Sequence, residues 1–159
     1  MKSILNILTL KRSLILSAVV LGLLVIFNFY GPYTNKFYFF KVSNYILPVL
    51  TIAHFTYLYV LWFKITEHED TDLPMRNLEY ALYGIVLVYI YKTFESLYVL
   101  TTYSDYESHV MPSVFLPLGI LILLLYLFLI GLTVLLIKYR KENVGEYKFD
   151  DMDHIDSWE

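Results

Sequence analysis

The stretch VFLPLGILILLLYLFLIGLTVLLI, residues 114–137, decides the class of this protein. It consists almost entirely of Leu, Ile, Phe and Val, and it contains no charged side chain. A helix needs about 20 apolar residues, each rising about 1.5 Å, to cross a hydrocarbon layer of roughly 30 Å. The stretch is therefore long enough and apolar enough for a transmembrane helix.

Three further apolar stretches precede it, at 13–30, 40–63 and 78–103. Hydrophobic residues make up 58% of the 159-residue chain and charged residues only 17%, which is far from the balance of a soluble domain. Because the connections are short, consecutive helices are expected to be antiparallel neighbours. The sequence thus predicts an all-α, four-helix up-down antiparallel bundle across a membrane in residues 1–138, with an acidic tail in 139–159.

The basic residues predict the orientation of this bundle. Of the twelve Lys and Arg residues, nine fall on the side of the two termini, two fall on the opposite side, and Lys92 lies within the third stretch. Loops rich in Lys and Arg stay in the cytoplasm, so both termini are expected to be cytoplasmic. A bacterial inner membrane is the default, and an organellar membrane is the alternative. The first group is Lys2, Lys11, Arg12, Lys64, Arg76, Lys138, Arg140, Lys141 and Lys148, and the second is Lys36 and Lys41.

Charged residues inside the third stretch predict an intramembrane polar cluster. Lys92 and Glu95 are three residues apart, so on a helix they can pair on one face. A single charge near the bilayer centre costs about 2.5–3.5 kcal/mol or more, so pairing is expected. Tyr89 and Ser96 border the same side, and His54 lies at a similar depth in the second stretch. Because the third stretch is the most polar of the four, it is expected to face protein more than lipid. The fourth stretch can face lipid.

The residue types of this cluster are compatible with more than one role. A neutralised pair that holds helices together is one reading, and an ion or proton path is the other. Haem ligation by His54 is a weaker reading, because the other histidines fall outside the apolar stretches. Without Cys, and without clustered His and carboxylates in any stretch, no metal site, cofactor or catalytic residue is predicted.

The tail combines acidic and large apolar residues. Its apolar residues recur at every third position between Asp and Glu residues. This pattern predicts a docking segment for a cytoplasmic partner, with an unstructured end or packing on the bundle as alternatives. The acidity argues against nucleic acid as a partner. The four apolar residues are Phe149, Met152, Ile155 and Trp158.

These observations favour a non-enzymatic subunit or assembly factor of a larger membrane complex. Such a protein would contact membrane lipids and either other subunits or copies of itself. The alternative is a small homo-oligomeric ion or proton channel, or a proton-coupled transporter, that uses His54, Lys92 and Glu95. A membrane redox subunit sharing a haem or quinone site near His54 is a third hypothesis.

Overall fold

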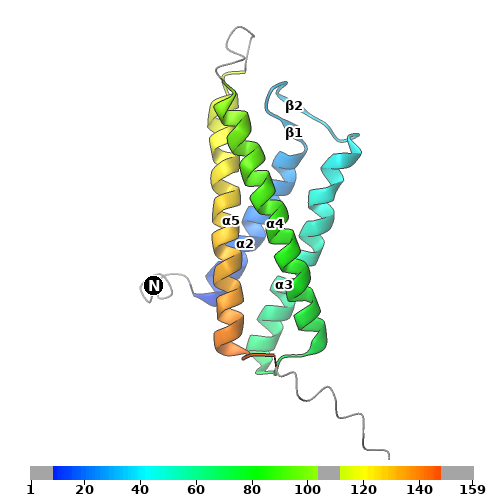
Figure 1. The fold of residues 1–159 in the computed structure, drawn as a ribbon, viewed down its shortest axis with the longest axis vertical. Helices are drawn as coiled ribbons and strands as arrows, with labels where there is room; N and C mark the ends of the chain where they lie inside the picture. The colour runs from blue at the N-terminus through cyan, green and yellow to red at the C-terminus, as the bar shows by residue number, and fades with distance from the viewer. Residues whose placement is uncertain (1–8, 104–111, 148–159) are drawn as a thin grey trace, which may run out of the picture.

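The computed structural model describes residues 9–103 and 112–147, and the proposed docking residues of the tail lie outside this part (Figure 1). Four long helices dominate the described residues, and each is long and apolar enough to cross a membrane. The prediction of an all-helical protein with four candidate membrane spans is therefore confirmed. The helices are α2 (Leu10–Asn28), α3 (Ile46–Glu67), α4 (Leu73–Thr101) and α5 (Phe115–Asn143).

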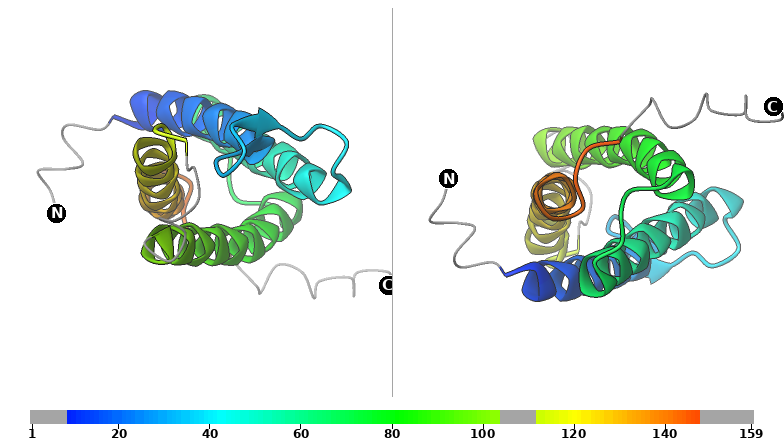
Figure 2. Two further views of the ribbon diagram at one scale, coloured as in Figure 1. Left: turned by 90° about the horizontal axis from the view of Figure 1, so that it is seen from above. Right: turned by 90° about the horizontal axis from the view of Figure 1, so that it is seen from below.

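The helices surround a shared core. Helices α2 and α4 each pack against both α3 and α5, and the chain reverses direction from one helix to the next (Figures 1 and 2). We call the end where α5 finishes and α3 connects to α4 the tail end. The opposite end, which we call the hairpin end, holds a short antiparallel hairpin of β1 (Tyr30–Gly31) and β2 (Lys36–Phe37).

The second helix begins later than its apolar residues indicate. Residues 40–45 were expected to be helical, but Phe40 is fully exposed and a 3-10 turn, η1, occupies Val42–Tyr45. Helix α3 begins only at Ile46, which places Pro48 in the first turn. Proline is tolerated there because first-turn amides have no partner within the helix. Hydrophobicity alone does not reveal this boundary.

The third and fourth helices extend beyond the predicted stretches. Helix α4 starts before residue 78 because the Asp72 carboxylate accepts a hydrogen bond of 2.9 Å from the Met75 amide and caps the first turn. Pro74 lies in that turn, where its fixed φ suits a helix start. Helix α5 continues past residue 137 to Asn143, since no helix breaker interrupts its basic end.

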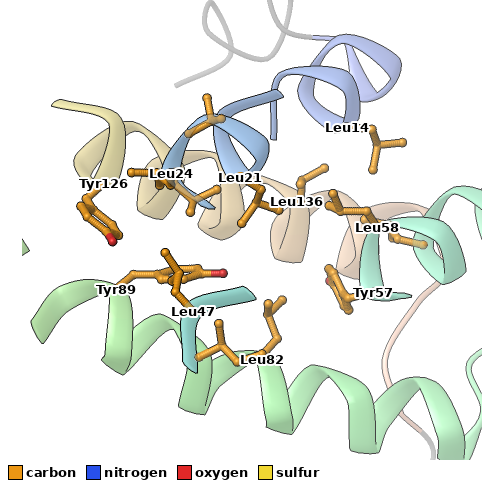
Figure 3. Close-up of a cluster of buried hydrophobic side chains, with 14 of the residues drawn as sticks. Leu14, Leu21, Leu24, Leu47, Tyr57, Leu58, Leu82, Tyr89, Tyr126 and Leu136 are labelled. Carbon is orange, nitrogen blue, oxygen red and sulfur yellow. The ribbon is translucent and has the colours of Figure 1, made fainter. Parts of the chain in front are cut away.

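Leucine and tyrosine side chains fill the core (Figure 3). Tyr57 and Tyr89 are its largest fully buried side chains. Toward the hairpin end, Gly119 lets α5 approach α4 closely, because a Cβ at this position would lie 2.7 Å from Cδ2 of Leu100. Other core residues include Leu21, Leu24, Leu61, Leu82, Leu129 and Leu136.

Helix α4 is the least covered of the four. Only 11% of the residues in its most apolar window are buried, against 28% to 33% in the other helices. Within the described residues the chain covers α4 less than α5, so the expectation that α4 faces protein more than lipid stays a prediction that depends on contacts outside this chain. The mean polarity of a stretch does not show which face of its helix is covered. Helix α4 packs against its neighbours through one narrow strip, which includes Met75, Leu82 and Tyr89.

Candidate functional site

Part of the predicted polar cluster lies in the core. His54 of α3 and Tyr89 of α4 are both fully buried, and Nδ1 of His54 lies 3.0 Å from the Tyr89 hydroxyl. This hydrogen bond joins the two helices at the middle of the bundle. Nε2 of His54 has no hydrogen-bond partner among the described residues.

The charged part of the cluster lies closer to the hairpin end. Nζ of Lys92 is 2.6 Å from Oε2 of Glu95, which is the pair that the sequence spacing predicts. The two side chains keep 32% and 47% of their surface exposed. Among the described residues, no hydrogen bond or ion pair connects either of them to His54. The structure thus divides the predicted cluster into a buried pair and an accessible one.

The accessible pair lines a cavity of about 580 Å³. Helices α3 and α4 separate toward the hairpin end (Figure 1), and all four helices contribute lining residues. Ser96 lines the cavity with the charged pair, whereas His54 and Tyr89 are not among the lining residues. Its polar lining among the described residues includes Asn28, Lys41, Ser43, Asn44, Lys92, Glu95 and Ser96.

The charges in this cavity lie within the part of α4 that a hydrocarbon layer centred on its midpoint would cover. Leu87 is the middle residue of α4, so Lys92 and Glu95 lie about 8 and about 12 Å from the helix midpoint at 1.5 Å per residue. Half of the hydrocarbon layer is about 15 Å thick. Accessible charges at such depth need water or a polar partner beside them. The cavity therefore provides a polar environment within a span that is otherwise apolar.

A second ion pair, which the sequence reasoning missed, closes the tail end. Glu79 and Arg140 are almost completely buried, and Oε2 of Glu79 lies 2.7 Å from Nε of Arg140. Nη2 of Arg140 donates a further bond of 2.7 Å to Oε1 of Glu79. The hydroxyls of Tyr83 and Tyr147 also donate to the Glu79 carboxylate. Burial and this hydrogen bond raise the pKa of Tyr147, so it stays a neutral donor.

Arg140 also binds the chain that follows α5. Its Nη1 donates a hydrogen bond of 2.8 Å to the carbonyl of Gly145, and its guanidinium stacks on the Tyr147 ring. In the sequence, only Glu79 indicates this site, because a carboxylate early in an apolar helix needs a partner. Its partner lies 61 residues away, so no local spacing rule identifies it.

A polar network joins α3 to the start of α4 at the tail end. Nζ of Lys64 lies 2.8 Å from both Glu69 and Asp72. Partial burial opposes ionisation of Asp72, but hydrogen bonds from Lys64 and the Met75 amide hold its pKa below the ordinary value. The connection between the helices is therefore fixed by the same carboxylate that caps α4.

These sites support binding and packing. Within residues 9–103 and 112–147, no group of three or more His, Asp and Glu residues is placed to hold a metal ion. Comparison with known proteins finds no matching family model, no similar curated protein and no similar solved structure. The function has to be inferred from the cavity, the two ion pairs and the exposed surface of α4.

Proposed function

We propose that this protein is a non-enzymatic subunit or assembly factor of a larger membrane complex, and that α4 contacts the partner. In this proposal the chain crosses the membrane four times as an up-down antiparallel bundle. The observation that supports the contact is a row of large side chains on α4 with exposed fractions between 53% and 69%. We call this row the docking face, and it consists of Tyr80, Leu87, Tyr91, Phe94 and Tyr98.

The docking face follows the spacing of a helix–helix contact. Its members are separated by seven, four, three and four residues, and Gly84 fills the position that completes the alternation of four and three. This alternation keeps one face turned toward a neighbouring helix over several turns. Gly84 is itself exposed, and a small residue in such a row permits close approach of a second helix.

Tyrosine hydroxyls distinguish this face from a surface made for lipid. The hydroxyls of Tyr80, Tyr91 and Tyr98 make no hydrogen bond to other described residues. Lipid tails offer no acceptor, so the hydroxyls of Tyr80 and Tyr91, which lie about 10 and about 6 Å from the midpoint of α4, gain from a polar group on another protein. The exposed face of α5 carries mainly aliphatic residues such as Leu124 and Val134, which suit lipid contact.

A leucine in place of Gly84 tests the docking face without disturbing the bundle. A Cβ at Gly84 would meet no atom within 4 Å, and the same holds for Gly131 on the lipid-suited face of α5. We expect wild-type protein and Gly131→Leu to purify in mild detergent with stoichiometric partner proteins, and Gly84→Leu to lose them. Native mass and identification of the co-purifying chains provide the measurement.

Other results of this purification would change the proposal. If Gly84→Leu retains its partners as Gly131→Leu does, α4 is not the contact. A wild-type protein that purifies as a monomer contradicts the subunit hypothesis. A homo-oligomer that Gly84→Leu dissociates means that the partner is a second copy of this chain, and it favours the channel hypothesis.

The channel or transporter is the second candidate, and one observation favours it. Lys92 and Glu95 line a cavity at membrane depth, as an ion or proton path would require. Between this cavity and the tail end, however, the core residues Tyr57, Leu61 and Leu82 are buried. Flux in liposomes that is unchanged by Lys92→Met and Glu95→Gln would remove both residues from such a mechanism.

The proposed orientation has both termini in the cytoplasm of a bacterium with this protein in its inner membrane. It is supported by basic residues at the tail end, with Lys36 and Lys41 at the hairpin end. Because the chain lacks Cys, single cysteines at exposed positions report sidedness without background. In intact cells we expect an impermeant thiol reagent to label Lys36→Cys and not Asp70→Cys. The reverse labelling would invert the topology.

The tail remains a proposed docking segment for a cytoplasmic partner. Its residues Phe149, Met152, Ile155 and Trp158 lie outside the described residues, so the proposal depends on their pattern. A chain ending after Tyr147 keeps the hydrogen bond to Glu79 and should fold normally. We expect it to lose soluble partners while retaining the membrane partner of the docking face. Retention of every partner would exclude the tail as a contact.

A further inference from the structure

The described lining of the cavity at the hairpin end has an excess of positive charge. Among the described residues, its charged lining residues are Lys41, Lys92 and Glu95. Lys92 is committed to Glu95, whereas Lys41 forms no ion pair with another described residue. The cavity thus holds one neutralised pair and one further ammonium group. An anion is the occupant that this balance favours.

The remaining wall of the cavity is apolar. Phe27, Val88, Val99 and Ile122 line it, and they come from α2, α4 and α5. A hydrated inorganic anion gains nothing from such a surface, whereas a hydrocarbon chain is stabilised by contact with it. The lining therefore suits a molecule with two chemically different parts.

The size and position of the cavity also suit such a molecule. Its volume of about 580 Å³ lies within the range of about 300–1,000 Å³ that is common for small-molecule sites. Its lining extends from Lys41, next to η1, down to Tyr126 in the core. A head group at the membrane surface and a chain directed into the bundle would follow this polar-to-apolar sequence.

We propose that the cavity binds one anionic lipid, whose phosphate is held by Lys41 and whose hydrocarbon chain contacts the apolar wall. The Lys92–Glu95 pair lines the same cavity, and the Lys92 ammonium can donate to the ester oxygens of the lipid, directly or through a water molecule. The cavity shares Tyr91 with the docking face, but its charged residues, Lys41 before η1 and the Lys92–Glu95 pair, are not members of that row.

Binding of defined lipids to the purified full-length chain tests this proposal. Phosphatidylglycerol and phosphatidylcholine are titrated separately into detergent-solubilised protein, and native mass spectrometry counts the bound molecules. We expect one phosphatidylglycerol to bind and phosphatidylcholine to bind more weakly. A hydrogen bond to a charged group contributes enough that Lys41→Gln should raise the Kd for phosphatidylglycerol about tenfold.

Two further variants make the test specific. Lys36 lies at the same end but does not line the cavity, so Lys36→Gln should leave the Kd unchanged. Val99→Trp fills the apolar wall and should weaken binding of the lipid while leaving all charges in place. Thermal unfolding without added lipid confirms that each variant is folded.

Three results would overturn the proposal. Equal affinity for the two lipids removes the anionic preference, and equal effects of Lys41→Gln and Lys36→Gln remove the site. Displacement of the lipid by inorganic phosphate at the same concentration shows that a free oxyanion from water is sufficient, and the hydrocarbon chain then has no role.

Discussion

The two ends of the bundle hold the same chemistry in opposite environments. At the tail end, the Glu79–Arg140 pair is buried and surrounded by hydrogen-bond donors. At the hairpin end, the Lys92–Glu95 pair is accessible and lines a cavity. Both carboxylates belong to α4. One helix therefore carries a buried ion pair near its start and an accessible ion pair near its end, because the neighbouring helices are close together at one end and separate at the other.

Loss of Arg140 should have the largest effect on stability. Arg140→Met leaves the Glu79 carboxylate buried without its cation, and breaking a buried pair costs about 3–5 kcal/mol. The free energy of unfolding in detergent measures this loss. The adjacent, exposed Lys141 provides the control, and Lys141→Met should have little effect. A double variant, Glu79→Leu with Arg140→Met, should recover much of the stability, since no buried charge remains.

The middle of the bundle should show an intermediate effect. Tyr89→Phe removes the hydrogen bond to Nδ1 of His54 and leaves a buried nitrogen without a partner, which costs about 1–3 kcal/mol. Tyr98→Phe removes an exposed hydroxyl and should change stability by less than about 0.5 kcal/mol. Equal values for the two variants would mean that the His54–Tyr89 contact does not stabilise the core.

Loss of the accessible pair should cost less. Lys92→Met leaves Glu95 beside a cavity that water reaches, and accessible ion pairs contribute about 0–1 kcal/mol. The same unfolding measurement therefore compares the two ends directly. A loss as large as that of Arg140→Met would show that the cavity excludes water, and the contrast between the ends would not hold.

The smallest expected effect is a pH dependence at the connection between α3 and α4. The pKa of Asp72 is lowered in the folded chain, so its contribution to stability is present above the unfolded value of 3.8 and is lost as the pH falls through the folded value. Stability measured from pH 6 to about pH 3 should fall more in wild-type protein than in Asp72→Asn. Parallel curves would show that Asp72 has the same pKa in both states.

Much of the fold could be predicted from the sequence because the dominant signal is local. The uniform apolar residues of 114–137 identify α5, and the three-residue spacing of Lys92 and Glu95 identifies their pair. The start of α4 was missed although Asp72 and Pro74 carry a local signal for it. A boundary drawn from hydropathy does not use Asp72 and Pro74, because hydropathy measures how apolar a segment is and not where its first turn is capped.

The tail-end site and the surface of α4 could not be predicted in the same way. The partner of Glu79 comes from another helix, and only the packing of α4 against α5 brings Arg140 to it. The docking face depends on which side of α4 remains uncovered, which is a property of the whole bundle. The sequence shows that Tyr91 falls inside the third apolar stretch, but it does not show that no described residue covers its side chain.

The contacts that follow α5 hold residues 145–147 against the tail end of the helices. Thr71 donates a hydrogen bond to the carbonyl of Glu146, and Tyr147 donates to Glu79, so this segment lies across the tail end beside α4 (Figure 1). A molecule that binds residues beyond Tyr147 is consequently tethered near the start of α4, the helix that carries the proposed docking face. Tethering raises its effective concentration there, so that a weak second contact on α4 becomes sufficient to hold it.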